Sequence, residues 1–185
     1  MMTFRHSTAS LVVLSALTFG TQLAVAPANA DDAPGNEVML ANTQTGKCLT
    51  IAGGVSTANN VVALQFSCDR HPSRRWTLEP ASNGNFMIRN LQTGKCLTIA
   101  GGRSTENNVE ALQFTCDGDA SRRWAMTSLP DGTFKIRNVQ TGKCLTIAGG
   151  TSTDNNVHAV QFSCDGHPSR TWRVIRQGGG PIDDN

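Results

Sequence analysis

Six cysteines are the residues best suited to chemistry. They form three pairs whose members are twenty positions apart: Cys48 and Cys68, Cys96 and Cys116, Cys144 and Cys164. In an oxidising compartment, pairing within each set is the simplest of the fifteen possible disulfide connectivities. Structural zinc sites usually include cysteines separated by only two to four residues, and these pairs lack that spacing. We therefore expect three disulfides and no metal site.

Each second cysteine is followed directly by an aspartate, and an arginine comes five residues after that aspartate. A carboxylate and a guanidinium at this spacing can form an ion pair with charge-assisted hydrogen bonds. Such a pair could pin the loop beneath the tryptophan that follows, or it could form the polar wall of a ligand pocket. Both interpretations stay open. The pairs are Asp69 and Arg74, Asp117 and Arg122, and Asp165 and Arg170.

Recognised catalytic motifs are absent from the sequence. It contains no nucleophile elbow, no H-E-x-x-H and no phosphate-binding glycine loop. His71 and His167 occupy equivalent positions at which the middle copy of a repeated unit has Asp119, a variation typical of exposed loops rather than of a general base. We therefore expect a non-enzymatic protein without a cofactor.

Charge is sparse and nearly balanced. Sixteen Lys and Arg stand against 14 Asp and Glu in 185 residues, which gives a net charge of +2. Domains that bind nucleic acid usually concentrate Lys and Arg on one face, so this balance argues against a nucleic-acid partner. No apolar stretch reaches the roughly 18 residues that a membrane span needs.

The first thirty residues have the pattern of a secretory signal peptide. Arg5 provides the charged start, residues 11–17 form a short apolar core, and Ala28-Asn29-Ala30 is a small-x-small cleavage site. We predict cleavage after Ala30 and a secreted, extracellular protein, in which disulfides form readily.

Most of the remaining chain consists of three copies of one unit. The segment QTGKCLTIAGG occurs unchanged at residues 44–54, 92–102 and 140–150, so the period is 48. We predict repeats at about 37–84, 85–132 and 133–175, which together form a single domain at 37–175. Residues 31–36 would be a short leader and residues 176–185 a flexible tail.

Within a unit, short apolar runs alternate with turn-forming residues. Repeat two predicts strands at 86–89, 96–100, 109–116 and 123–126, which makes about twelve short strands in three copies. A propeller typically needs four to eight such units, so an all-β architecture with internal threefold symmetry is favoured. Its core would be built by equivalent residues of each copy, represented in repeat two by Phe86, Ile88, Leu97, Ile99 and Trp124.

Each copy has an N-x-x-T-G-K-C-L opening, an Asn-Asn turn, an aromatic-x-Cys strand end and a terminal Trp. With these motifs, residues 38–174 resemble the ricin-B-type β-trefoil lectins, also classified as family 13 carbohydrate-binding modules. The resemblance implies a β-trefoil of three tandem 48-residue repeats with pseudo-threefold symmetry. It also implies up to three shallow sugar pockets.

The pockets depart from the pattern of the family. Members that bind galactose-like sugars have an Asp directly after the C-L pair and end each repeat in Q-x-W, whereas this chain has threonine and arginine at those positions. A Thr hydroxyl cannot replace the charged, bidentate acceptor. The resemblance therefore implies altered pockets in which the Asp–Arg pairs could take over. The threonines are Thr50, Thr98 and Thr146.

The stacking aromatic of the family falls on a phenylalanine that follows a glutamine in each copy. An aromatic face can pack on a sugar ring while amides read its hydroxyl groups. Strand alternation leaves open whether the phenylalanine faces a pocket or the core, since a one-residue difference in register exchanges the two faces. The candidates are Gln65 and Phe66, Gln113 and Phe114, and Gln161 and Phe162.

The sequence thus predicts a secreted, monomeric, lectin-like protein whose partner is a glycan or polysaccharide. The alternative is a protein-interaction module, such as an inhibitor or a subunit of a secreted complex, whose partner is another secreted protein and whose trefoil has lost sugar binding.

Overall fold

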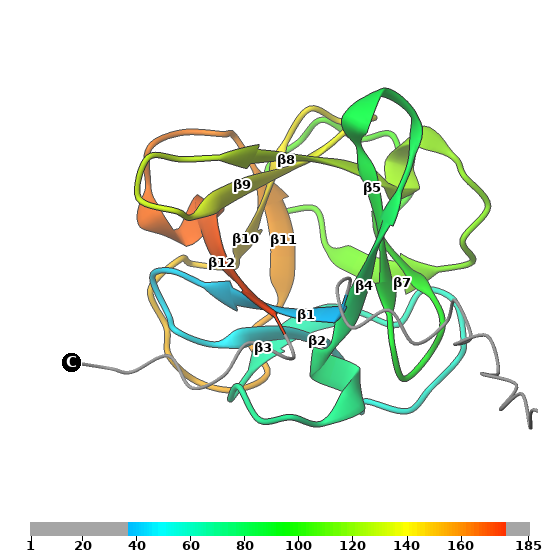
Figure 1. Ribbon diagram of the computed structural model, residues 1–185, viewed down its shortest axis with the longest axis horizontal. Coiled ribbons are helices and arrows are strands. Elements are labelled where there is room, and N and C mark those ends of the chain that lie inside the picture. The colour runs from blue at the N-terminus through cyan, green and yellow to red at the C-terminus, as the bar shows by residue number, and fades with distance from the viewer. Residues whose placement is uncertain (1–36, 177–185) are drawn as a thin grey trace, which may run out of the picture. The chain divides into compact units, whose positions relative to one another are not determined.

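The computed structural model describes residues 37–176, which form twelve strands. Six of them close a barrel, because each pairs with the next and the last pairs with the first (Figure 1). All of these pairings are antiparallel. The barrel strands are β1 (Glu37–Asn42), β4 (Trp76–Pro80), β5 (Phe86–Asn90), β8 (Arg123–Ser128), β9 (Phe134–Asn138) and β12 (Thr171–Arg176).

The other six strands form one hairpin in each repeat: β2 (Cys48–Ile51) with β3 (Ala63–Phe66), β6 (Cys96–Ile99) with β7 (Ala111–Phe114), and β10 (Cys144–Ile147) with β11 (Ala159–Phe162). A short 3-10 helix precedes the last strand of each repeat: η2 (Pro72–Arg74), η4 (Ala120–Arg122) and η5 (Pro168–Arg170). A further one, η3 (Ser82–Gly84), lies in the turn between β4 and β5. This all-β arrangement confirms the expected β-trefoil.

Equivalent residues from the three copies fill the interior. Trp76, Trp124 and Trp172 are fully buried, and each indole nitrogen donates to the carbonyl of the leucine after the first cysteine, at 2.9 to 3.0 Å. Ile88, Leu97 and Ile99 belong to the same core. Phe86 does not, which corrects the expectation: it is only half-buried near the β4–β5 turn, whereas its counterpart Val38 is fully buried.

The three disulfides connect the cysteines within each repeat, as expected. The third strand of repeat two is shorter than predicted and covers only Ala111–Phe114. Asn108, at φ +64°, turns the chain before it, and Glu110 makes only an isolated bridge to Val160.

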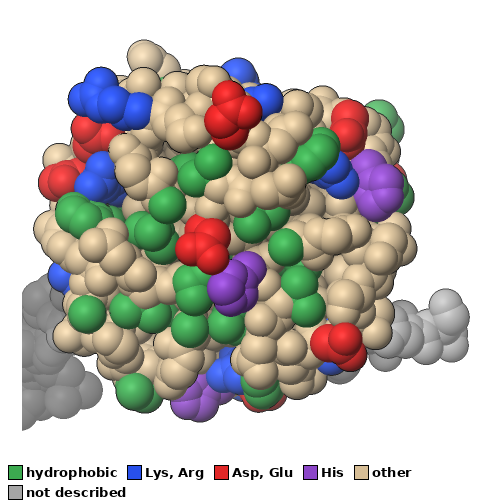
Figure 2. Space-filling model, turned by 180° about the vertical axis from the view of Figure 1, so that it is seen from behind, with side chains coloured by type: hydrophobic (Ala, Val, Ile, Leu, Met, Phe, Trp, Pro, Cys, Tyr) green, Lys and Arg blue, Asp and Glu red, His purple; other side chains and the backbone are tan. Residues whose placement is uncertain are grey.

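The ends of the chain differ in how far the structure describes them. Arg176, expected at the start of the tail, is the last residue of β12. The predicted signal peptide, the leader and residues 177–185 lie outside the described residues. Within residues 37–176 no helix is long and apolar enough to cross a membrane. On the face shown in Figure 2, basic side chains are scattered and form no continuous patch.

Candidate functional site

A surface hollow of about 400 Å³ lies between the hairpin of repeat one and the loop that contains η2. Its lining includes four of the five residues that the sequence singled out in this repeat: Thr50, Phe66, Asp69 and Arg74. A second hollow, of about 210 Å³, is lined by the equivalent Thr98, Phe114 and Arg122 of repeat two. The trefoil therefore brings the candidate residues together at equivalent places.

The register of the hairpins decides which way the phenylalanines face. Phe66 lies opposite Cys48, and Gln65 lies opposite Leu49. Phe66 and Leu64 line the hollow, whereas Ala63 and Gln65 are fully buried on the other face of the strand. Phe66 and Phe114 each line a hollow, and they and Phe162 are half-buried and outside the core cluster.

Each phenylalanine is covered by the arginine of its own repeat. The guanidinium carbons of Arg74, Arg122 and Arg170 lie 4.3, 4.4 and 4.3 Å from the ring centroids, which is cation–π distance. Their Nε atoms lie 3.2 to 3.3 Å from an oxygen of the paired aspartate. Ring, guanidinium and carboxylate thus form a stack that is repeated three times.

The two charges of the Asp–Arg pair differ in exposure. The arginine side chains are only 10 to 13% exposed, whereas those of Asp69, Asp117 and Asp165 are 45 to 54% exposed. Oδ1 of Asp69 also accepts the backbone N–H of His71, at 3.0 Å. None of the described residues bonds to Oδ2. The arginine therefore braces the loop, and the aspartate keeps one oxygen available to solvent.

The threonines after the C-L pair are buried and hydrogen-bonded within the protein. Thr50 is 2% exposed, and its hydroxyl donates to the carbonyl of Ser73 at 2.9 Å. Thr98 and Thr146 make the same bond to Ser121 and Ser169. These side chains fix the loop of each 3-10 helix, and in the hollow of repeat one Asp69 remains the charged acceptor.

The glutamine side chains also form hydrogen bonds inside the protein, although the sequence suggested that they flank a sugar. Gln65 is fully buried and lines neither hollow. Its Nε2 donates to the carbonyls of Ser152 and Asp154 at 2.8 and 2.7 Å, and its Oε1 accepts from Thr45 at 2.7 Å. Gln65 therefore joins repeat one to a loop of repeat three.

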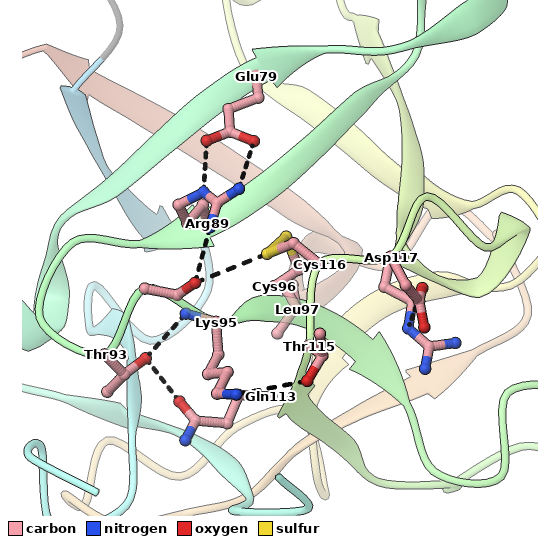
Figure 3. The surroundings of a disulfide bond; sticks show 12 residues. Glu79, Arg89, Thr93, Lys95, Cys96, Leu97, Gln113, Thr115, Cys116 and Asp117 are labelled. Atoms are coloured by element: carbon pink, nitrogen blue, oxygen red, sulfur yellow. Dashed lines mark hydrogen bonds and ion pairs between the residues drawn. A yellow bond between two sulfur atoms is a disulfide. The ribbon is translucent and has the colours of Figure 1, made fainter. Parts of the chain in front are cut away.

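The other two repeats are joined in the same way. Gln113 holds the loop of repeat one, and Gln161 holds the loop of repeat two. Figure 3 shows Gln113 on the hairpin that carries the Cys96–Cys116 disulfide, with its oxygen bonded to Thr93. In the same view Asp117 lies beside a guanidinium group, directly after the disulfide.

Asn60 and Asn156 line the hollows of the repeats that follow theirs, and sequence reasoning missed both. Asn60 belongs to repeat one and lines the hollow of repeat two, while Asn156 belongs to repeat three and lines that of repeat one. Both have positive φ, at +65° and +68°. The Asn-Asn turns were the signal in the sequence, because asparagine favours such backbone conformations.

The residue before each 3-10 helix differs between repeats. His71 and His167 cap η2 and η5 by accepting the N–H of Ser73 and Ser169 at 3.2 Å. In repeat two, Asp119 accepts both the N–H and the hydroxyl of Ser121, at 2.9 and 2.8 Å. These bonds from Ser121 lower the pKa of the Asp119 carboxyl below its usual value of 3.8. Among residues 37–176 no group of three or more His, Cys, Asp or Glu could hold a metal ion.

A closed barrel, three hairpins and equivalent hollows in repeats one and two define a β-trefoil with repeated surface sites. The chain belongs to the ricin-type β-trefoil lectin domain-like family, whose model matches residues 22–114, 82–160 and 120–182. A search of curated proteins found no match.

Similar solved structures include proteins of several kinds. The designed threefold-symmetric protein ThreeFoil is 23% identical over 76% of this chain and 99% of its own, with a TM-score of 0.72. The Rhizoctonia solani agglutinin is 16% identical over 78% and 96%, with a TM-score of 0.68. An exo-β-1,3-galactanase from Clostridium thermocellum is 25% identical over 77% of this chain but only 30% of its own, with a TM-score of 0.73.

Proposed function

We propose that this protein is a secreted, non-enzymatic lectin that binds glycans through up to three weak, repeated surface sites. The observation that carries the proposal is the stack of phenylalanine, arginine and aspartate beside each hollow, in a chain of a lectin-like family. Sugar recognition combines an apolar surface for the C–H groups with polar groups for the hydroxyls, and each stack offers both.

The aspartate is the principal hydrogen-bonding group in this proposal. The free oxygens of Asp69, Asp117 and Asp165 accept sugar hydroxyls, while the arginine behind each carboxylate neutralises its charge. A site with balanced charge favours uncharged glycans over strongly acidic or basic ones. The hollow of repeat one also has Val55 at its rim, 67% exposed, which adds apolar surface.

Avidity compensates for weak individual sites. Hollows spread around the trefoil can engage several sugars of one polysaccharide, and simultaneous binding raises the apparent affinity about a hundredfold or more where the geometry permits. Polysaccharides with repeated identical units are therefore favoured over isolated monosaccharides.

A glycan array, together with pull-downs on insoluble xylan, chitin and cellulose, tests the proposal on protein with intact disulfides. We expect binding that is lost roughly tenfold or more when Asp69, Asp117 and Asp165 are all changed to Asn, because each site loses a charge-assisted bond. Asp131→Asn is the matched control, because Asp131 likewise caps a backbone N–H, that of Thr133, but lines neither described hollow. Blank arrays and blank pull-downs with folded protein would exclude the proposal.

The second candidate is a protein-interaction module, and the buried Thr50 favours it because that hydroxyl is already bonded to Ser73. Affinity capture from native culture medium separates the two functions. A stoichiometric protein partner that free sugars do not displace would support the module, whereas elution by sugars would support the lectin.

Amino-terminal sequencing of the exported protein tests cleavage after Ala30.

A further inference from the structure

The second asparagine of each Asn-Asn turn has a side chain that the fold does not use. Asn60, Asn108 and Asn156 are exposed, and within residues 37–176 their side-chain amides form no hydrogen bond. Two of them, Asn60 and Asn156, line hollows that belong to the next repeat around the trefoil. Asn108 occupies the same position of the turn in repeat two.

The backbone holds these asparagines firmly in place. The N–H of Asn156 donates to the carbonyl of Gln65 at 2.8 Å, and Asn60 and Asn108 donate to Gln113 and Gln161 at 2.9 and 2.8 Å. The three glutamines are fully buried, so these bonds hold the backbone of each asparagine against the hairpin of the neighbouring repeat. The backbone of Asn60 and that of Asn156 are therefore held at the edge of the hollow that each residue lines.

The first asparagine of each turn has a different role. The side-chain oxygen of Asn155 accepts the backbone N–H of Ser67 at 2.9 Å, and Asn107 accepts that of Ser163 at 3.0 Å. Asn59 accepts from the hydroxyl of Thr115 at 3.2 Å. One asparagine thus attaches the loop to the neighbouring repeat, and the next one leaves a donor and an acceptor unpaired.

We propose that each sugar site is shared between two repeats, with Asn156, Asn60 and Asn108 acting as ligand-reading residues for repeats one, two and three. This inference rests on the proposed lectin function and names residues of its sites. An amide both donates and accepts, so it can bind two neighbouring sugar hydroxyls. In the hollow of repeat one, Asn156 and Asp69 are both lining residues, so the amide supplies a donor that the carboxylate lacks.

A left-handed turn gives another reason for asparagine, since this residue tolerates positive φ better than most. Glycine separates the two reasons, because it accepts the same backbone conformation but has no amide. If backbone conformation alone matters, changing the asparagines to glycine leaves binding intact.

The decisive variant carries Asn60→Gly, Asn108→Gly and Asn156→Gly together. Asn83→Gly is the matched control, because Asn83 has φ +60° and lies in the exposed η3 turn, outside both described hollows. Both proteins are compared with the wild type on the glycan array and on insoluble xylan, chitin and cellulose, with the melting temperature as a measure of folding.

We expect the triple variant to melt within a few degrees of the wild type and to bind the same glycans roughly tenfold more weakly, while Asn83→Gly binds as the wild type does. Wild-type affinity in the folded triple variant would overturn the shared site and leave the lectin function standing. A wild-type protein that binds none of these glycans would overturn both.

Discussion

The guanidinium carbon of Arg74 lies 4.3 Å from the centroid of the Phe66 ring. This contact joins the loop of η2 to strand β3, and the ion pair with Asp69 joins the same loop to the residue after the disulfide. The arginine therefore occupies one face of the ring, so a bound sugar has access to the ring only where the guanidinium does not cover it. The arrangement explains why a residue in the family's pocket position can also stabilise the fold.

Changing Arg74 to Gln should destabilise the protein by roughly 1 to 2 kcal/mol. The variant loses the cation–π contact and the ion pair, and its Asp69 is left without a cationic partner. Urea denaturation measures the change, and Arg103→Gln, at an exposed position, is the control. An unchanged midpoint would show that the arginine does not brace the loop.

Changing Gln65 to Ala should cost at least about 3 kcal/mol of stability. Two backbone carbonyls and one hydroxyl lose their partner in a buried site, and each unsatisfied group costs roughly 1 to 3 kcal/mol. Gln92→Ala is the exposed control. A stable Gln65→Ala protein that has lost glycan binding would contradict the structural role and place Gln65 in the sugar site.

Gly53 and Gly54 should respond differently to alanine. Both have positive φ, so each substitution costs roughly 1 to 2 kcal/mol of backbone energy. A methyl group on Gly54 would also lie 3.2 Å from Oγ of Ser73, whereas one on Gly53 would meet nothing within 4 Å. We expect Gly54→Ala to be the less stable by about 1 kcal/mol in thermal denaturation. Equal losses would mean that Ser73 can move aside.

The Asp119 cap should make stability depend on pH. Bonds from Ser121 lower the pKa of this carboxyl in the folded state, so its contribution is fully present above its usual value of 3.8. The contribution is lost as the pH falls through the lower folded value. The melting temperature of the wild type should therefore exceed that of Asp119→Asn at pH 7, and the difference should shrink below about pH 4. A constant difference down to pH 2 would contradict this explanation.

The fold could be predicted from the sequence because the threefold repeat restricts the possible architectures. A period of 48 with cysteine and tryptophan at fixed places leaves few architectures, and the disulfides followed from the same spacing. Phe86 was misplaced because its half-buried position near a turn has no signature in the apolar pattern.

The site was harder to predict because it depends on contacts between distant parts of the chain. Gln65 is buried by carbonyls that lie 87 and 89 residues away, and no local pattern reveals them. The orientation of Phe66 depends on the hairpin register, which alternation alone leaves undecided. Asn156 reaches its hollow from another repeat, so a search within one repeat could not assign it.

The first and last strands of the domain pair as if they were two arms of one hairpin. β1 and β12 share five residue pairs, as do β4 with β5 and β8 with β9, where a turn connects the arms. The ends of the domain are consequently neighbours. The gap between the end of β12 and the start of β1 occupies a place equivalent to those two turns. The point at which the domain begins is thus arbitrary for this architecture: joining residue 176 to residue 37 through a short linker and opening the domain at η3 would give a circular permutant with the same ring of strand pairings.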